Sequence, residues 1–530
     1  MPTRTRIAAL TTALALLLTG CSGGGGAESD SQTQAGPTSS DSAPSRTPIT
    51  PADYAEEAAT IVDGFTEDEL AGSLIIGTWA GTESRTAVDM VRKSSLGGVI
   101  VMADNLTETP TPKEVTALTT AVAGARTKGQ PVSIAIDQEG GPVSRLSTAA
   151  LPFPPLMALA ATDDLKLRTQ ATTVQAQNLA DLGFTIDFAP DSDVTIGPKD
   201  VAINVRSAGG DPQAVAEVVA QAVDGYQAGG VASSAKHFPG HGRLTVDSHE
   251  ALPVSTKSID ELEDSDLVPF KSAVKAGVPM VMMGHIGLPD AKTTPASLNE
   301  KAYSALREKL DFDGVIVTDA LNMKAVTQSA KGSETVAALA AGADLALMPP
   351  DAAAAQQAVV AALGDGTLKK DDLVEKSRRV VAMQLATAAK QKQSGSTGES
   401  ADPDPVLTEV AEKSVTVLKG ECAYPGTQAI SIVGGSEKEK AALAKAAEKA
   451  GLRVGSGTTV SLSPRTSAEV AVGTAAPWTM RSSPAQTAVT AYDSNPYALG
   501  AVAKWLKGDL TATGTLPVEY EGSDKAPDCG

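Results

Sequence analysis

The stretch Gly314–Met323, GVIVTDALNM, is a short apolar run that ends in an acidic residue and leads into a helix-forming segment. Its residues Val315 to Thr318 are all β-branched, a composition that favours a buried strand. Asp319 stands where such a strand would end. The same arrangement of strand, polar strand end and helix recurs along the chain, and this recurrence decides the fold class.

Eight apolar runs of this kind occur between Ala52 and Gln391, each followed by a segment rich in Ala, Leu, Glu and Lys. They are continuous rather than alternating, as expected of strands covered on both faces. Eight strand–helix units predict the α/β class and a (β/α)8 barrel of the TIM type, with insertions. The runs are Ala71–Trp79, Gly97–Met102, Val132–Asp137, Thr185–Ala189, Val231–His237, Pro279–His285, Gly314–Asp319 and Ala343–Met348.

The chain divides into a barrel at residues 51–390, a polar linker at 391–404 and a second domain at 405–530. The linker sequence is rich in Gly, Ser and Pro, which is typical of connectors. After it, the strand-like runs VTVLKG, AISIVGG and TAVTAY alternate with helical segments, so we expect a smaller α/β sandwich domain. This second domain contains no histidine.

The N-terminus has the features of an export signal. Arg4 and Arg6 precede an apolar run, Ile7–Leu18, that is too short for the roughly 20 residues of a membrane span. The following Leu-Thr-Gly-Cys resembles a lipobox, so residues 1–20 are expected to be a lipoprotein signal peptide and Cys21 the lipidated residue. Residues 21–50 are too polar to fold and are expected to form a tether. The predicted location is the outer face of the cytoplasmic membrane.

Charge and cysteine content restrict the partners. The formal net charge is −19, and it becomes −21 once the two arginines of the signal peptide are removed. An anionic surface disfavours nucleic acid, so membrane association is expected through the lipid alone. We expect a monomer. Cys422 and Cys529 would remain as one candidate disulfide in an oxidising compartment.

Ionisable residues stand at the ends of four of the predicted strands. Asp137 ends the third run, Lys236 and His237 the fifth, His285 the sixth and Asp319 the seventh. In a (β/α)8 barrel the carboxyl ends of the strands form one rim, where the active site lies. The sequence therefore predicts a catalytic site on this rim.

Four motifs in the barrel resemble a known family. They are IDQEGGPVSRL at 136–146, KHFPGHG with a following DSH at 236–249, GHIGLPD with PASL at 284–298, and GVIVTDALNMKAV at 314–326. In this order they resemble the bacterial β-N-acetylglucosaminidases of glycoside hydrolase family 3. The C-terminal segment AYDSNPYALGAVAKWLKGDLTATGTLPV is similar to the second domain of longer members.

The resemblance implies a retaining, two-step hydrolysis through a covalent glycosyl-enzyme. Asp319 matches the family nucleophile, and a carboxylate suits this role because it is ionised at neutral pH. His249 matches the acid/base, with Asp247 as the residue that orients it. Histidine titrates near pH 6.5 without tuning, whereas a carboxylic acid would need a raised pKa.

The resemblance also implies which residues bind the sugar. A polyhydroxylated ring loses water on binding, so each buried hydroxyl needs a hydrogen-bond partner. The matching positions are Asp137, Arg145, Arg206, Lys236 and His237. The implied substrate is a non-reducing terminal β-linked N-acetylglucosamine, from peptidoglycan fragments, and no cofactor is implied.

Two positions depart from the pattern of many relatives. Arg243-Leu244 replaces Asp-Thr after KHFPGHG, and Pro142 replaces Arg after DQEGG. His241 is expected to brace its loop, and His285 could either brace or bind. The departures bear on the leaving-group side and hence on the aglycone.

Three alternatives remain open from the residues. His237, His241 and His249 with Asp247 are ligand types that zinc accepts, although Pro239-Gly240 prevents the helical spacing of a zinc-protease motif. An exported α/β lipoprotein could bind a solute. Phosphate rather than water could release the sugar, because a histidine acid/base does not repel phosphate.

Overall fold

The computed structural model describes residues 49–125, 128–330, 332–395 and 402–530. The predicted signal peptide, the lipidation site Cys21 and the tether as far as Pro48 lie outside the described residues. A compact unit begins at Ile49. The N–H of Thr50 donates to Asp53 Oδ2 at 2.7 Å and caps the first turn, so the predicted tether boundary at residue 50 is slightly late.

The barrel prediction is confirmed. Each of the eight predicted runs contains a strand, and the strands form one parallel sheet in the order β10-β1-β2-β3-β4-β5-β6-β9. A parallel bridge between Val317 and Leu345 joins β9 to the residue before β10, so the ring is nearly closed. The strands are β1 Ile75–Gly77, β2 Gly98–Ile100, β3 Ser133–Ile136, β4 Ile186–Asp187, β5 Ala232–Phe238, β6 Met280–Met283, β9 Val315–Thr318 and β10 Ala346–Leu347.

The first predicted run was wrong at its start. Ala71–Ser73 belong to helix α2, Glu67–Ser73, rather than to a strand. Thr66 and Glu69 form a capping box that starts this helix, with the Thr66 N–H donating to Glu69 Oε2 at 2.8 Å. The apolar composition alone could not distinguish the end of a buried helix from a strand.

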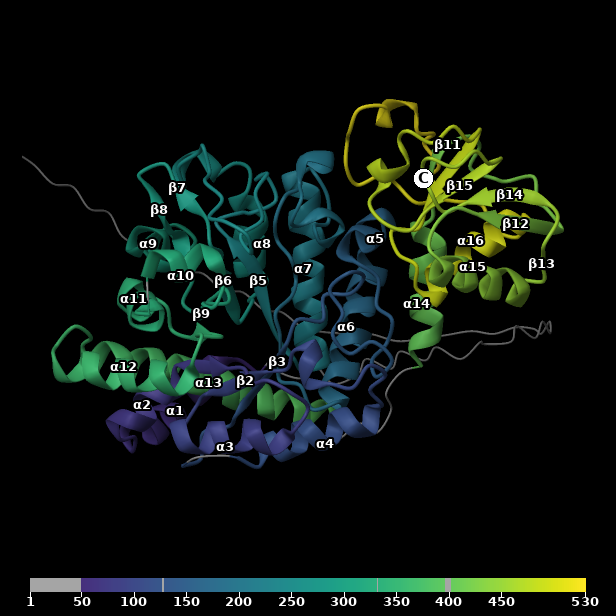
Figure 1. The fold of residues 1–530 in the computed structure, drawn as a ribbon. Coiled ribbons are helices and arrows are strands. Elements are labelled where there is room, and N and C mark those ends of the chain that lie inside the picture. Colours follow the sequence, from purple (N-terminus) through teal and green to yellow (C-terminus); the bar gives the residue numbers. More distant parts are fainter. Residues whose placement is uncertain (1–48, 126–127, 331, 396–401) are drawn as a thin grey trace, which may run out of the picture. The chain divides into compact units, whose positions relative to one another are not determined.

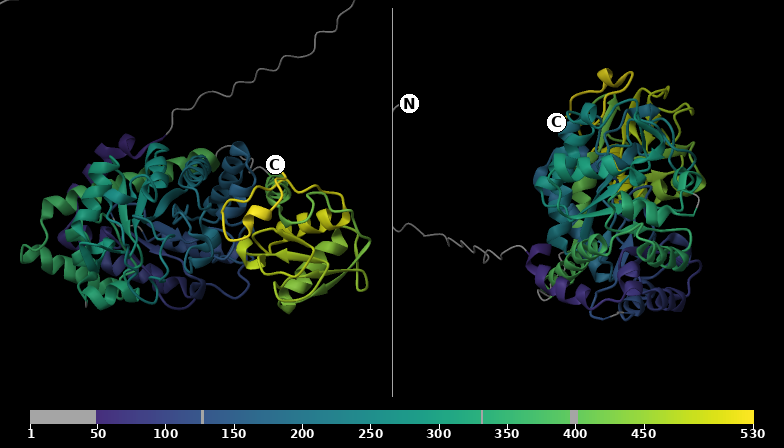
Figure 2. Two further views of the ribbon diagram at one scale, coloured as in Figure 1. Left: turned by 90° about the horizontal axis from the view of Figure 1, so that it is seen from above. Right: turned by 90° about the vertical axis from the view of Figure 1, so that its left-hand side faces the viewer.

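Helices surround the barrel strands, as Figures 1 and 2 show. One β-hairpin, β7 Gly287–Leu288 with β8 Ala291–Pro295, is inserted after β6. The helices of this domain are α1 Ala55–Asp63, α2 Glu67–Ser73, α3 Ser84–Ser94, α4 Pro112–Ala123, α5 Leu156–Ala161, α6 Leu165–Asp181, α7 Pro212–Gly229, α8 Leu267–Lys275, α9 Glu300–Lys309, α10 Lys324–Ala330, α11 Glu334–Ala341, α12 Ala352–Gly364 and α13 Lys370–Gly395.

The barrel strands bury both faces, which explains their continuous apolar sequences. Along β3, Ile134 and Ile136 pack in the layer between sheet and helices, whereas Ala135 faces the barrel interior. The interior cluster continues into Val380 and Met383 of α13, which cover one end of the barrel. The opposite end, where the strands terminate, is left for the loops that carry the candidate site.

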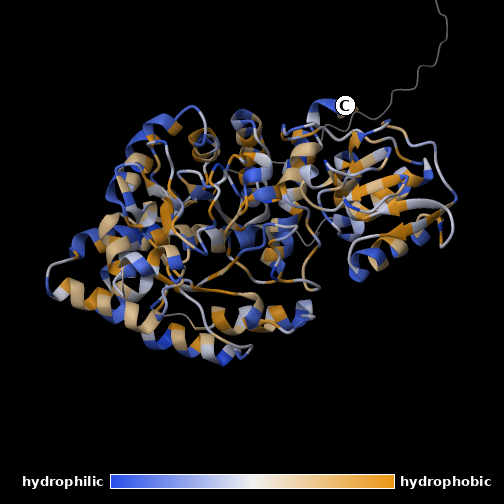
Figure 3. Ribbon diagram, turned by 45° about the horizontal axis from the view of Figure 1, so that its top comes forward, coloured by the Kyte–Doolittle hydropathy of each residue, from blue (hydrophilic) through white to orange (hydrophobic). Residues whose placement is uncertain are grey.

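The second domain is a six-stranded sheet with helices packed on one face. Val470 and Val472 of β15 face the helices, while Ala471 packs on the other face with Met480. In Figure 3 the strands of this sheet are coloured mainly as hydrophobic. The elements are α14 Pro403–Ser414, β11 Thr416–Lys419, β12 Ala429–Val433, α15 Glu437–Lys449, β13 Arg453–Val454, β14 Thr458–Ser461, β15 Val470–Gly473, β16 Thr487–Thr490 and α16 Pro496–Lys507.

The predicted linker at 391–404 is shorter than expected. Helix α13 continues to Gly395, and α14 begins at Pro403 with Asp402 as its N-cap. Gln391 Nε2 donates to the carbonyl of Phe184 at 2.7 Å. The first residue of the predicted linker is therefore held against the barrel. The remainder, residues 396–401, lies outside the described residues.

Cys422 and Cys529 are joined by a disulfide, with their Cα atoms 5.7 Å apart. It links the last residues of the chain to the start of the second domain. Within the part of the chain that the structure describes, no helix is both long and apolar enough to cross a bilayer.

Candidate active site

The barrel brings the predicted strand-end residues to one rim. Asp137 follows β3 directly, and Asp319 follows β9 directly. Lys236 and His237 lie within the last residues of β5, which extends to Phe238. Because all these strands are parallel, their carboxyl ends face the same side of the sheet. The rim predicted from the sequence is therefore present.

Asp319 is held by its neighbours on the rim. Its N–H donates to the carbonyl of Met283 at 2.9 Å, and its Oδ1 accepts the N–H of Ala320 at 2.7 Å. Burial favours the neutral acid, but His285, His237, the Ala320 N–H and Lys236 outweigh it and lower the pKa to about 2. The side chain is therefore a carboxylate at neutral pH, as a nucleophile requires.

Two cations, buried Lys236 and partly buried Arg206, converge on Glu139, which was not among the predicted site residues. Lys236 Nζ lies 2.6 Å from Glu139 Oε1 and 2.8 Å from Asp137 Oδ1. Arg206, from the short helix η4 Asn204–Arg206, donates to both oxygens of Glu139 at 2.8 Å. Burial opposes the ionisation of Glu139, but Arg206 and Lys236 hold its pKa well below the usual range. The carboxylate thus fixes both cations in place.

His237 is oriented by a second missed residue, Asp193. The imidazole Nδ1 lies 2.8 Å from Asp193 Oδ2, and the Asp193 side chain is fully buried. Asp193 Oδ1 also accepts the backbone N–H of His241 at 2.6 Å. His237 Nε2 lies 3.4 Å from Arg206 Nη2.

His249 and Asp247 form a pair on the loop after β5. The imidazole Nδ1 lies 2.8 Å from Asp247 Oδ1, and the same oxygen accepts the backbone N–H of His249 at 2.9 Å. Partial burial raises the pKa of Asp247, but the two contacts with His249 lower it by more. The His249 side chain is 70% exposed, so the ring is accessible to a ligand or to water.

His285 supports its surroundings through hydrogen bonds, whereas the expectation that the His241 side chain braces its loop finds no hydrogen bond among the described residues. His285 is fully buried, with Nδ1 2.7 Å from Ser297 Oγ and Nε2 2.9 Å from the carbonyl of Ala320. It therefore braces the backbone next to Asp319. His241 is also buried, and neither ring nitrogen has a hydrogen-bond partner among the described residues. Burial lowers the pKa of His241 to about 4, which keeps it neutral.

Arg145 is joined more loosely to the site. Its Nη2 lies 3.9 Å from Asp137 Oδ2, and its side chain is 31% exposed. The guanidinium is therefore available to a ligand at the edge of the cluster formed by Asp137, Glu139, Lys236 and Arg206.

The histidines considered for zinc are not gathered into one ligand set among the described residues. His237 bonds buried Asp193, whereas His249 bonds Asp247 at the surface. The ligand atoms that do lie within 4.8 Å of one another belong to Asp191, Asp193 and His237. Arg206 Nη2 is 3.6 Å from Asp191 Oδ2. This arrangement already balances the carboxylates with a guanidinium and an imidazole, so it does not fit a divalent cation well.

Asp191 and Asp193 could have been found from the sequence. They follow the fourth predicted run in the segment APDSD, residues 189–193, whereas Asp137 is the last residue of the third. Glu139 stands two residues after Asp137 in DQEGG. None of these three acids stands at the end of a predicted run, so the strand-end criterion did not select them.

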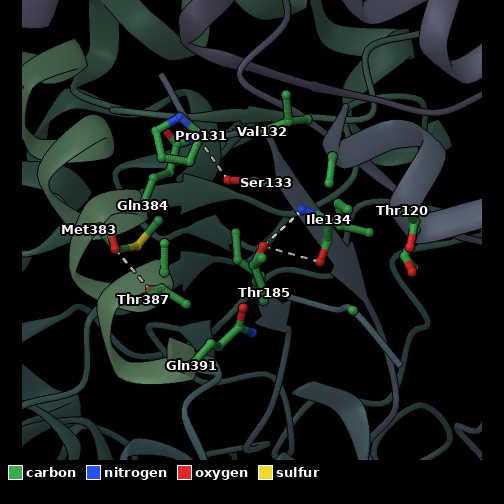
Figure 4. Close-up of a pocket in the computed structure, with 15 residues that line it drawn as sticks. Thr120, Pro131, Val132, Ser133, Ile134, Thr185, Met383, Gln384, Thr387 and Gln391 are labelled. Atoms are coloured by element: carbon green, nitrogen blue, oxygen red, sulfur yellow. Dashed lines mark hydrogen bonds between the residues drawn. The ribbon is translucent and has the colours of Figure 1, made fainter. Parts of the chain in front are cut away.

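A cavity of about 270 Å³ in the barrel domain lies away from this rim. It is lined by residues at the amino ends of strands and by α13, and Figure 4 shows Ser133, Thr185 and Gln384 among them. Gln384 Nε2 donates to Ser133 Oγ at 2.8 Å, and the Thr387 hydroxyl donates to the Met383 carbonyl at 2.9 Å. These polar groups are satisfied internally, and none is an ionisable group suited to catalysis.

Comparisons with known proteins agree with the geometry. A family model described as the glycosyl hydrolase family 3 N-terminal domain matches residues 67–383. A curated beta-hexosaminidase of Pseudomonas aeruginosa is 33% identical over 298 residues, which cover 55% of this chain and 86% of that protein. Beta-hexosaminidase LpqI of Mycobacterium tuberculosis is 34% identical over 353 residues, covering 64% and 87% respectively.

A longer relative matches only in part, whereas a solved structure matches over nearly its whole length. Beta-hexosaminidase A of Pseudoalteromonas piscicida is 35% identical over 283 residues, and the match spans 49% of this chain and 47% of that protein. Among solved structures, a family 3 beta-N-acetylglucosaminidase from Paenibacillus is 27% identical with a TM-score of 0.75, covering 86% of this chain and 99% of that one. The family model spans more than half of the chain and ends close to the barrel boundaries, so the chain belongs to glycosyl hydrolase family 3 and is a glycoside hydrolase.

Proposed function

We propose that this protein is a retaining exo-β-N-acetylglucosaminidase that removes non-reducing terminal β-linked N-acetylglucosamine. The observation that carries the proposal is the pairing of two features on one rim. Asp319 is ionised at the end of β9, and the His249–Asp247 pair lies on the loop after β5. The names of the curated beta-hexosaminidases and of the Paenibacillus enzyme support the choice of sugar.

In the first chemical step, a carboxylate oxygen of Asp319 attacks the anomeric carbon while the bond from that carbon to the leaving oxygen breaks. The imidazolium of His249 gives its proton to the leaving oxygen, so the aglycone departs as a neutral alcohol. The product is a glycosyl ester of Asp319. Asp247 holds the ring and stabilises its charged form through the 2.8 Å contact to Nδ1.

In the second step, neutral His249 removes a proton from water, and the resulting oxygen attacks the anomeric carbon. The ester bond to Asp319 breaks and the carboxylate is restored. Each step inverts the anomeric centre, so the overall configuration is retained. Phosphate could replace water in this step, and product analysis with and without phosphate distinguishes the two acceptors.

We place the sugar against the cluster formed by Asp137, Glu139, Lys236 and Arg206. Lys236 and Asp137 form one ion pair, while Arg206 lies beside His237 Nε2. Hydroxyl and N-acetyl groups of the sugar can replace solvent on these donors and acceptors without leaving a buried polar group unpaired. Arg145 would add a contact at the pocket edge.

We propose peptidoglycan fragments as the natural substrate and a lipid anchor on Cys21 as the means of retention outside the cytoplasmic membrane. The apolar run at residues 7–18, the Leu-Thr-Gly-Cys sequence and the polar segment after it support export and anchoring. The polymer that contains N-acetylglucosamine outside the cytoplasmic membrane is the peptidoglycan of the cell wall, which is why we propose its fragments as the substrate.

The function is tested by turnover of a chromogenic aryl β-N-acetylglucosaminide. The wild-type protein should release the phenol and N-acetylglucosamine. Asp319→Asn should abolish release, whereas Asp313→Asn, at the opposite end of β9 and exposed, should leave it unchanged. Binding of the sugar without release by the wild-type protein would instead favour a solute-binding role.

A further inference from the structure

The short helix η4, Asn204–Arg206, carries Arg206 on a long connection between β4 and α7 that runs from residue 188 to 211. Arg206 is the only cation among the described residues that bonds both oxygens of Glu139. Connections of this length without regular structure need external support to hold one conformation. The position of the Arg206 guanidinium therefore depends on what holds this loop.

On its inner side the loop is wound around Asp200, which is 2% exposed. Asp200 Oδ1 accepts the N–H groups of Ala202 and Ile203, at 3.1 and 2.9 Å. Its Oδ2 accepts the Thr195 hydroxyl at 2.7 Å and the N–H of Asn204 at 3.1 Å. These bonds fix the backbone of the turn. They do not hold the side chain of Val205, the residue before Arg206.

Val205 packs in a hydrophobic cluster that the barrel and the second domain share. It is 5% exposed and belongs to a cluster that combines barrel residues with side chains from beyond residue 475. The barrel residues of this cluster are Met157, Ala158, Ala161 and Val205, and those of the second domain are Ala476, Trp478, Tyr492 and Val518. The cluster is separate from the main cores of both domains.

The backbone around the loop is held by the same domain. The N–H of Gly210 donates to the carbonyl of Pro517 at 3.1 Å. A Cβ at Gly209 would lie 2.3 Å from that carbonyl oxygen, so the two segments approach each other more closely than a residue with a side chain would allow. A Cβ at Gly210 would lie 3.2 Å from Val518 Cγ2. The segment 515–519 therefore fits against the loop along both its backbone and its side chains.

We propose that the second domain positions Arg206 for sugar binding by clamping Val205 with Trp478, Tyr492 and Val518. This inference rests on the proposed sugar-binding role of Arg206. Val205 and Trp478 are positioning residues, because they act through the η4 backbone and touch neither sugar nor reacting atoms. Loosening the clamp should let the guanidinium move away from Glu139 and from the sugar, and small displacements of binding groups are costly.

The test compares Val205→Ala and Trp478→Ala in the full-length protein with Val460→Ala. Val460 is fully buried in the main core of the second domain, away from the clamp, and serves as the control for general destabilisation. Urea unfolding measures stability, and KM and kcat are measured with an aryl glycoside and with a natural disaccharide. The clamp variants should raise KM by about fivefold or more on both substrates, while the control changes KM by less than about twofold at similar loss of stability.

Two results would overturn the inference: an unchanged KM in Val205→Ala, or an equal rise in Val460→Ala. The double variant Val205→Ala/Trp478→Ala should raise KM little more than either single change, because both remove one clamp. Fully additive effects would contradict a shared action. Arg206→Ala is the separate arm: if it leaves KM unchanged, the sugar-binding role of Arg206 fails, independently of whether the clamp exists.

Discussion

Removal of the acid/base histidine should affect substrates according to their leaving groups. In His249→Ala the proton donor is lost, while Asp319 and the sugar pocket keep their contacts because His249 is 70% exposed and packs on none of them. The leaving sugar of a disaccharide departs as an alkoxide unless its oxygen is protonated. The acidic phenol of an aryl glycoside departs unaided, as the phenolate. His249→Ala should therefore lose activity on the disaccharide but keep most of the rate of the first chemical step on the aryl glycoside.

The contacts of the His249–Asp247 pair indicate how much activity His249→Ala and Asp247→Ala should each lose. General acid catalysis is worth about 10²- to 10⁴-fold, so this is the expected loss in kcat/KM for His249→Ala on a disaccharide. Asp247 contacts Nδ1 at 2.8 Å but is 37% exposed, and an exposed ion pair contributes about 0.2 to 1 kcal/mol. Asp247→Ala should therefore cost only about 1.5- to 5-fold through charge stabilisation. Any further loss measures the orientation of the ring.

The assay is steady-state kcat/KM for a series of aryl β-N-acetylglucosaminides whose phenols span a range of acidity, together with a disaccharide. The logarithm of kcat/KM should depend steeply on phenol acidity in His249→Ala and weakly in the wild type. Equal losses across the series would refute the acid/base role. Inactivation of the wild type by a strong chelator would favour a metal-dependent reaction instead.

Three further results are expected. The pKa of Asp319 is lowered from 3.8 to about 2, so its contribution to stability is present above about pH 4 and is lost as the pH falls towards 2. Asp319→Asn should therefore make the free energy of unfolding less dependent on pH in this range. An unchanged pH dependence in urea unfolding would count against this. Cys422→Ser should lower the unfolding free energy by up to about 5 kcal/mol, given the sequence separation of 107 residues, yet keep kcat/KM within about twofold; two titratable thiols in the denatured, unreduced wild type would show that the bond to Cys529 is absent. Cys21→Ala should move the protein from the membrane fraction to the soluble fraction in cell fractionation, and unchanged membrane retention would rule out the lipid anchor.

The strand pattern was readable because the barrel strands bury both faces. Ile134 and Ala135 of β3 pack in two different cores, so neither face of the strand has to be polar and the strand appears as a mainly apolar run. A run that ends in a charged residue then marks the catalytic rim, as Asp137 and Asp319 do. The start of the first run failed because buried helix α2 is equally apolar at Ala71.

The supporting carboxylates were less accessible to sequence reasoning. Glu139 and Asp193 act through contacts with Arg206 and His237, residues distant from them in the chain. Their partners are set by tertiary packing, which a local pattern does not encode. The cluster that Val205 shares with Trp478 is an extreme case, because it joins two domains. Only an assembled structure brings these residues together.

The central claim is that Asp319 forms the covalent bond to the sugar. It is tested most directly by incubating the protein with an activated fluorosugar analogue of N-acetylglucosamine that forms the glycosyl-enzyme faster than it is hydrolysed. Peptide mass spectrometry should then locate one sugar on the peptide containing Asp319, and the adduct should be absent in Asp319→Asn. A sugar attached to another carboxylate, such as Asp191 or Glu139, or steady turnover with no covalent adduct at any time, would contradict the account.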